Sequence, residues 1–295
     1  MRHSPPPTNL MLRLPFLAVI LCTPLLAKAE PLSSGAGHFD FRRAGKTVPV
    51  WYFLPEKVGP NAPILFVMHG VNRDADRYRD DWIPHAKAKN FIVIAPEFSS
   101  AEFPGNENYS LGGMKLGQSS AQPSKASSYS FLEPIFEEVK RSTENRSESY
   151  WLYGHSAGAQ FVHRYLYFMP KAHVTAAVAA NAGWWTMPDP AVDFPYGLHR
   201  SAVSVVGLKT MLQRKLTILL GTADTDPNDE NLQRSPEAMV QGVHRFARGH
   251  TFFEAGQKRA AALAIPLGWQ LSTAPGIAHS DSGMAEFAVT ALFGK

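Results

Sequence analysis

The stretch SYWLYGHSAGAQFVHRYLYFMP, residues 149–170, decides the fold of this chain. Its centre, GHSAG, matches the G-x-S-x-G pattern of a tight turn that joins a strand to a helix and exposes a serine between them. The residues before it predict a short strand over 149–153, and those after it predict a helix over 159–169 that Pro170 ends. Small residues around Ser156 allow the strand and the helix to approach closely. This context predicts that Ser156 is a nucleophile.

Strands and helices alternate on both sides of this turn. A hairpin through Gly45 and Lys46 is expected to join strands at 38–43 and 48–54. Apolar runs predict buried parallel strands at 64–68, 91–95, 174–180, 216–220 and 269–272. Helices are predicted over 74–89, 130–141, 201–214, 237–264 with a break near Gly249, and 283–293. The alternation is typical of an α/β fold, a mainly parallel, doubly wound sheet covered on both faces.

The first 29 residues differ in character from the rest. Basic residues and prolines open the chain, an apolar stretch follows at 14–26, and the sequence AKA at 27–29 resembles a cleavage site. We therefore expect residues 1–29 to be a secretory signal peptide, too short for a stable membrane span. An uncleaved anchor is the alternative. Residues 30–295 would form one periplasmic or extracellular domain that is not attached to the membrane.

Removal of this leader changes the composition. The leader carries three basic residues and no acidic residue, so the formal net charge falls from +4 to about +1. A nearly neutral mature chain gives no reason to expect a nucleic-acid partner. Cys22 lies in the leader, so the mature chain would have no disulfide and would depend on packing for its stability.

A serine hydroxyl needs a base within hydrogen-bond reach and a carboxylate that orients the base. In folds built around this turn, the acid and then the histidine follow the serine along the chain. Asp224 follows the predicted strand at 216–220, and His279 precedes the last helix. We expect Asp224 to be the acid and His279 to be the base. Asp226 and Asp229 are alternatives for the acid. Asp281 also lies near His279 in the sequence, but we expect it to begin the last helix.

The charge that develops on a carbonyl oxygen during attack needs two hydrogen-bond donors, the oxyanion hole. The backbone N–H of Ala157, directly after Ser156, is expected to be one of them. The other should come from the loop HGVN at 69–72, where we favour the N–H of Val71. His69 would then orient this loop instead of transferring protons.

With these motifs in this order, nearly all of the mature chain resembles an α/β-hydrolase-fold serine hydrolase with a small cap segment. It is similar to secreted esterases of the polyhydroxybutyrate depolymerase and feruloyl esterase type in its leader, its two-stranded start, the pair His69-Gly70 and the GHSAG turn. The resemblance implies hydrolysis of carboxylic esters, in small molecules or polymers, without a cofactor. A related group cleaves the amides of poly(aspartic acid). This chain departs from many depolymerases because it has no disulfides and no separate substrate-binding domain.

Three functions remain open at this point. Ester hydrolysis through a Ser-His-Asp triad and an acyl-enzyme is expected first, because an ester has the better leaving group. Amide hydrolysis of polyanionic chains such as poly(aspartic acid) is the second. A non-catalytic binding protein on the same fold is the third, and the intact set of Ser156, Asp224 and His279 argues against it.

The remaining features concern substrate and metal binding. Trp184 and Trp185 stand where a small cap begins, and we expect them to line an acyl or aromatic pocket or else to pack the cap. Arg73, Arg77 and Arg79 lie among aspartates, which predicts a solvated helix face, with Arg73 placed to reach an anionic group. Histidine and cysteine spacings typical of a metal site are missing, so we expect no metal and no cofactor.

Overall fold

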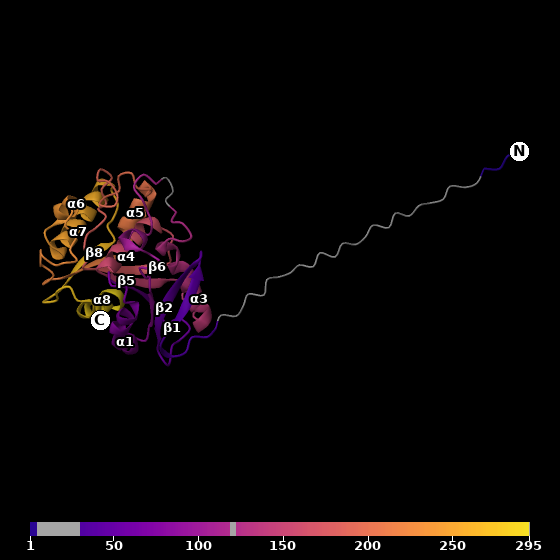
Figure 1. Ribbon diagram of the computed structural model, residues 1–295, viewed down its shortest axis with the longest axis horizontal. Helices are drawn as coiled ribbons and strands as arrows, with labels where there is room; N and C mark the ends of the chain where they lie inside the picture. Colours follow the sequence, from indigo (N-terminus) through magenta and orange to yellow (C-terminus); the bar gives the residue numbers. More distant parts are fainter. Residues whose placement is uncertain (5–29, 119–121, 295) are drawn as a thin grey trace.

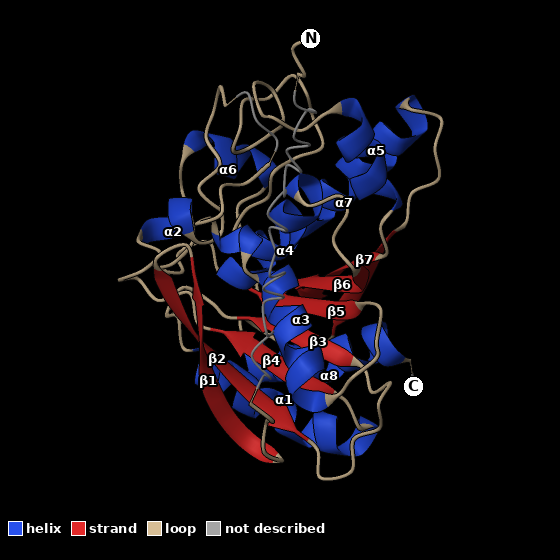
Figure 2. Ribbon diagram, turned by 90° about the vertical axis from the view of Figure 1, so that its right-hand side faces the viewer, coloured by secondary structure: helices blue, strands red, loops and turns tan. Residues whose placement is uncertain are grey.

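The computed structural model describes residues 1–4, 30–118 and 122–294. In these ranges, eight strands form one sheet in the order β1-β2-β4-β3-β5-β6-β7-β8 (Figure 2). The strands are β1 (Gly35–Arg43), β2 (Lys46–Leu54), β3 (Ile64–Met68), β4 (Ile92–Pro96), β5 (Tyr150–His155), β6 (Val174–Ala180), β7 (Leu216–Gly221) and β8 (Trp269–Ala274). β2 pairs antiparallel with both β1 and β4, and the six strands from β4 to β8 in this order run parallel. The predicted mainly parallel, doubly wound α/β sheet is confirmed.

Helices cover both faces of this sheet (Figure 1). α1 (Ala75–Lys89) and α8 (Asp281–Phe293) pack on one face, where Trp82 and Met284 are fully buried. The other face carries α3 (Leu132–Thr143), α4 (Ala157–Phe168), α5 (Val205–Gln213) and α7 (Arg245–Ala262). Short connections contain α2 (Gly105–Asn108), the 3-10 turn η1 (Ser128–Ser130) and α6 (Pro236–Gln241). Because both faces are covered, central strands such as β3 are apolar and buried along their whole length.

The segment before β8 is divided differently from the prediction. The helix was expected to break near Gly249, but α6 ends at Gln241, where the following Gly242 has φ of 147°, and α7 runs through Gly249. A Cβ atom at Gly249 would lie 2.3 Å from the side chain of Leu220 on β7. Gly249 therefore provides space for a helix to pack on the sheet, and the break belongs to Gly242, whose backbone conformation disfavours other residues.

The connection after β4 packs against the core, although its sequence has no clear periodicity. Phe98, Phe103 and Tyr109 are buried. The ring of Phe98 lies 4.9 Å from that of Phe103 and 5.7 Å from that of Phe161 on α4, measured between centroids. This aromatic cluster, which consists of these four residues, fixes the connection against the helix that follows Ser156.

The predicted signal peptide lies outside the described residues except for residues 1–4, and Cys22 lies outside them as well. Within the described ranges, no helix combines the length and the apolar character that a membrane span requires.

Candidate active site

The turn between β5 and α4 places Ser156 at the carboxyl end of a central strand. Ser156 has φ of 56° and ψ of −117°. This conformation is uncommon for a residue with a side chain and costs about 1–3 kcal/mol. Its N–H donates to the carbonyl oxygen of Ala180 at 3.0 Å, which fixes the turn against β6. Gly158 is required because a Cβ atom there would lie 2.0 Å from the carbonyl oxygen of Met68.

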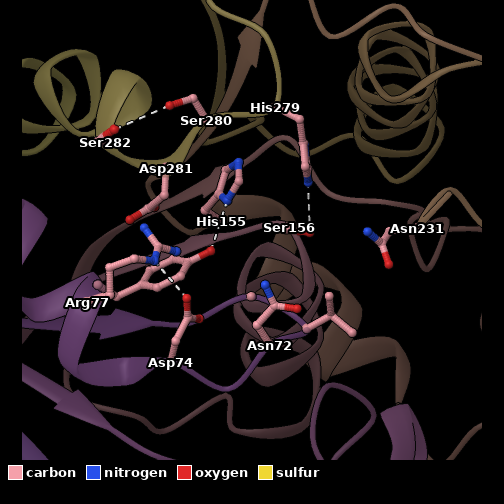
Figure 3. A pocket seen from close by; sticks show the side chains of 13 residues that line it. Asn72, Asp74, Arg77, His155, Ser156, Asn231, His279, Ser280, Asp281 and Ser282 are labelled. Carbon is pink, nitrogen blue, oxygen red and sulfur yellow. Dashed lines mark hydrogen bonds and ion pairs between the residues drawn. The ribbon is translucent and has the colours of Figure 1, made fainter. Parts of the chain in front are cut away.

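The structure brings Ser156, Asp224 and His279 together from three separate loops. His279 Nε2 lies 3.0 Å from Ser156 Oγ, and His279 Nδ1 lies 2.8 Å from Asp224 Oδ2 (Figure 3 shows the first contact). Asp224 is buried in the turn after β7, where its N–H donates to the carbonyl oxygen of Gly221 at 3.0 Å. If Nδ1–H donates to the carboxylate, Nε2 presents a lone pair to the serine hydroxyl. The arrangement can therefore take a proton from Ser156.

The two alternatives for the acid have other partners. Asp226 Oδ1 accepts the N–H of Asn228 at 2.8 Å, as in a turn. Asp229 pairs with Arg245 Nη2 at 2.8 Å, and this hydrogen bond lowers the pKa of Asp229 to about 2. Arg245 also approaches Asp224 Oδ1 at 3.4 Å, so one buried arginine holds both Asp224 and Asp229.

A pocket of about 330 Å³ opens beside Ser156 and His279 (Figure 3). Its walls come from the loop after β3, the start of α1, the end of β5, the loop before α6 and the start of α8, and they include Gly70, Val71, Asn72, Asp74, Arg77, Tyr78, His155, Asn231, Ser280, Asp281 and Ser282. Most of these side chains are polar. In the part of the chain that the structure describes, no group of three or more His, Cys, Asp or Glu residues is arranged to hold a metal ion.

The two residues predicted to donate to the oxyanion lie near Ser156. Val71 lines the pocket, and a Cβ atom built on Gly70, the residue before it, would lie 3.9 Å from the Cβ of Ser156. Ala157 directly follows Ser156 as the first residue of α4, where N–H groups have no partner inside the helix. Both residues are placed for the donor roles, which stay predictions.

His69 braces the loop that carries Val71. It is fully buried; its Nε2 accepts the N–H of Phe98 at 3.0 Å, so the ring proton lies on Nδ1, which donates to the carbonyl oxygen of Gly70 at 2.9 Å. Its ring stacks on Tyr109 at 4.6 Å between centroids. Burial lowers the pKa of His69 to about 4, so the ring is neutral near pH 7. These contacts correspond to the orienting role expected for it.

The arginines at 73–79 do not form one solvated face, which corrects the expectation. Arg73 donates to carbonyl oxygens of the connection after β4, and this engages its charge away from the pocket. Arg79 is buried and donates to a carbonyl oxygen of β2 at 2.9 Å. Arg77 lines the pocket and pairs with Asp74 and with Asp81, each at 2.7 Å. Each guanidinium thus has a separate task, which the alternation of charges along the sequence could not reveal.

Trp184 and Trp185 lie in the interior and are not among the residues that line this pocket. Trp185 is fully buried and stacks on Phe252 of α7 at 4.3 Å between centroids. Trp184 covers the guanidinium of the buried Arg164 at 3.9 Å. The backbone of Trp185 also exchanges two hydrogen bonds of 2.8 Å with the side chain of Gln241, which draws this segment inward. The geometry corresponds to the packing alternative, and the pocket-lining expectation is corrected.

Tyr78 and His155 were not singled out by any sequence pattern, and Asp281 was expected only to begin the last helix. Tyr78 is buried on α1, His155 is buried at the end of β5, and Asp281 is buried at the start of α8. Burial raises the pKa of Asp281 to about 8, and its Oδ1 accepts the hydroxyl of Tyr153 at 2.7 Å. The one available signal was the position of His155 inside the GHSAG turn, directly before Ser156.

Comparisons with solved structures find similar proteins above 30% identity, among them the following two. Poly(aspartic acid) hydrolase-1 from Sphingomonas sp. KT-1 is 47% identical, with a TM-score of 0.84 over 88% of this chain and 98% of that chain. LpqC, a poly(3-hydroxybutyrate) depolymerase from Bordetella parapertussis, is 32% identical, with a TM-score of 0.82 over 88% of this chain and 90% of that chain.

More distant structures share the fold alone. An S-formylglutathione hydrolase from Agrobacterium tumefaciens is 14% identical, with a TM-score of 0.55 over 90% of this chain and 96% of that chain. No family model matches the sequence, and no curated protein matches it.

Proposed function

This chain belongs to the α/β-hydrolase family of hydrolases, and we propose that it cleaves the backbone amides of an anionic polymer of the poly(aspartic acid) type through Ser156. The observation that carries the serine mechanism is the contact of 3.0 Å between His279 Nε2 and Ser156 Oγ at a strand-to-helix turn. An uncharged serine at neutral pH becomes a useful nucleophile only when a base of this kind can take its proton.

The proposed reaction follows from these contacts. Ser156 Oγ attacks the carbonyl carbon while its proton passes to His279, and Asp224 stabilises the imidazolium that results. The N–H groups of Val71 and Ala157 hold the oxyanion. When the C–N bond breaks, His279 returns the proton to the leaving amine. Water, activated by the same histidine, then hydrolyses the acyl-enzyme and restores Ser156.

The amide substrate rests on similarity. The poly(aspartic acid) hydrolase shares 47% of its residues with this chain and is covered almost completely, whereas the poly(3-hydroxybutyrate) depolymerase shares 32%. We therefore place the amide ahead of the ester, the reverse of the order expected from leaving-group chemistry. Ester hydrolysis, as in a polyester depolymerase, is the second candidate. The observation that favours it is the similarity to the poly(3-hydroxybutyrate) depolymerase.

Export fits either substrate. A polymer must be degraded before its pieces can enter a cell, so we propose that the predicted leader directs the enzyme to the periplasm or the medium. Mass spectrometry of the protein recovered from an expressing bacterium should give an N-terminus at Glu30. An intact residue 1 on the exported protein would contradict cleavage at this site.

A fluorophosphonate probe and two polymers test the proposal together. The wild-type protein should gain one covalent adduct on Ser156, and the variant Ser156→Ala should gain none. Wild-type protein should release free amino groups from poly(aspartic acid). The rate of this release should be lower by a factor of about 10⁴–10⁶ in Ser156→Ala.

The outcomes separate the claims. Labelling at Ser156 with cleavage of poly(3-hydroxybutyrate) alone would replace the amide substrate by the ester. If the protein is neither labelled nor active on either polymer, the serine mechanism is rejected, and the alternative of a non-catalytic binding protein on this fold is favoured.

A further inference from the structure

Two buried residues of the pocket wall, His155 and Tyr78, lie behind the imidazole of His279. His155 is the last residue of β5, and the centroid of its ring lies 4.5 Å from that of His279. Tyr78 of α1 places its hydroxyl 3.1 Å from His155 Nδ1. Figure 3 shows His155 in the pocket wall together with Ser156 and His279. The contacts form a continuous row from α1 through His155 to His279.

Both members of this pair are uncharged at neutral pH. Burial lowers the pKa of His155 well below its ordinary value, and the nearby His279, Arg245 and Arg77 act in the same direction. Burial raises the pKa of Tyr78 well above its ordinary value, so its hydroxyl keeps the proton. His279 can therefore gain a proton during the reaction without a like charge at the ring beside it.

The hydroxyl of Tyr78 also anchors the ring of His155 by a hydrogen bond. The bond joins the Tyr78 hydroxyl to Nδ1 of the neutral histidine, whose Nε2 is buried and has no hydrogen-bond partner among the described residues. One hydrogen bond thus fixes the orientation of the ring that packs on His279. Removal of the Tyr78 hydroxyl would leave a buried nitrogen without its hydrogen-bond partner, which costs about 1–3 kcal/mol.

The same hydroxyl reaches the loop that carries Val71. A Cβ atom at Gly70 would lie 2.7 Å from Tyr78 Oη, so the loop approaches this tyrosine as closely as a glycine permits. Tyr78 therefore touches both halves of the machinery. It bounds the loop expected to bind the oxyanion, and through His155 it supports the expected base.

We propose that Tyr78 and His155 are positioning residues that hold the ring of His279 and the loop of Val71 in register with Ser156. The inference rests on the proposed function, because it assigns the pair a task only if Ser156 and His279 react. A displacement of about 1 Å at a reacting group can cost on the order of 10²-fold in rate. Small shifts of this ring and this loop should therefore reduce turnover with little effect on folding.

The test uses Tyr78→Phe, which removes only the hydroxyl, and His155→Asn, which keeps a polar group but removes the ring. The rate at which the fluorophosphonate inactivates the full chain is measured across pH. The constants kcat and KM are measured with the polymer that the wild-type enzyme hydrolyses. We expect Tyr78→Phe to lower the inactivation rate and kcat by about 10–100-fold, with KM within about threefold of wild type. His155→Asn should move the acidic limb of the inactivation profile to higher pH, because water reaching His279 favours its protonated form.

Tyr150→Phe is the matched control. Tyr150 is a fully buried tyrosine on the same strand as His155, and its hydroxyl bonds to Glu133 at 2.6 Å and to Tyr165 at 2.8 Å. It should lose stability comparably but keep the wild-type inactivation rate. Equal inactivation rates and pH profiles for Tyr78→Phe, His155→Asn and wild type would overturn the positioning role while the serine mechanism stands. A wild-type protein that the probe fails to label would overturn the proposed function first.

Discussion

At the scale of single residues, one arginine secures the acid of the candidate triad. Arg245 is only 2% exposed, and its guanidinium contacts both Asp224 and Asp229. Asp224 therefore meets His279 through Oδ2 while Arg245 holds Oδ1 from the other side. A carboxylate that is already fixed needs little reorganisation when the neighbouring imidazole gains a proton.

We expect Asp224→Asn to lower kcat by about 10³–10⁴-fold, because an amide can donate to Nδ1 and thereby favour the wrong tautomer of His279. Asp226→Asn, two positions along the same loop, is the control and should change kcat by less than about threefold, since Asp226 bonds a backbone N–H. Both variants are compared with the wild type by the initial rate of hydrolysis of the polymer that the wild type cleaves, and by melting temperature. The reverse ranking would assign the acid to Asp226.

The positions of Ser156, Asp224 and His279 could be predicted because each follows a strand at a place that sequence patterns mark. The contact between Tyr78 and His155 could not be predicted, because it joins residues 77 positions apart and depends on how α1 packs on β5. Hydrophobic periodicity shows which face of a helix is buried, but it does not show which side chain that face meets.

At the scale of elements, two glycines determine how closely α4 approaches the sheet. A Cβ atom at Gly154 would lie 2.3 Å from the carbonyl oxygen of Gly158, and one at Gly158 would lie 2.0 Å from that of Met68. These neighbours are backbone atoms, which cannot rotate away as a side chain can. The space that the glycines leave thus lets the strand, Ser156 and the helix occupy their positions.

We expect Gly158→Ala to reduce the free energy of unfolding by about 1–3 kcal/mol, because β3 and α4 must separate to admit the methyl group. For a domain of this size, that corresponds to a melting temperature lower by roughly 2–12 °C. The control is Gly59→Ala, since no atom lies within 4 Å of the added Cβ. It should change the free energy of unfolding by less than about 1 kcal/mol. Equal melting temperatures for the two variants would contradict the close approach.

Glycines also show why element boundaries were harder to predict than element types. A glycine inside a helical pattern indicates either a break or a close contact, and the local sequence does not distinguish the two. Gly249 proved to be the contact and Gly242 the break. Trp184 and Trp185 present the same ambiguity, because large aromatic residues suit a pocket wall and a core equally well until the neighbouring helix is placed.

At the scale of the whole molecule, buried histidines limit stability in acid. Burial lowers the pKa of His69 to about 4 and holds the pKa values of His155 and His163 well below the ordinary range. In the unfolded chain, each titrates near about 6.5. Below that pH the unfolded chain binds more protons than the folded chain, so the free energy of unfolding decreases as the pH falls toward 4.

Asp281 acts in the opposite direction. It lies at the start of α8, near Asp81 of α1, and burial raises its pKa from 3.8 to about 8. Between about pH 4 and pH 8, the folded chain keeps a proton that the unfolded chain has released. The contribution of Asp281 to the free energy of unfolding is therefore fully present below about pH 4 and is lost as the pH rises toward 8.

Asp281→Asn should remove this alkaline loss, because asparagine has no proton to release. Its amide keeps an acceptor for the Tyr153 hydroxyl. We expect the variant and the wild type to be about equally stable near pH 4, and the variant to be the more stable near pH 9, as measured by urea denaturation at both values. Asp80→Asn, at an exposed carboxylate that pairs with Arg79, is the control and should show no growing difference between the two pH values. A wild type as stable as Asp281→Asn near pH 9 would mean that ionisation of this buried carboxyl does not destabilise the folded protein, and the alkaline loss assigned to Asp281 would have to be abandoned.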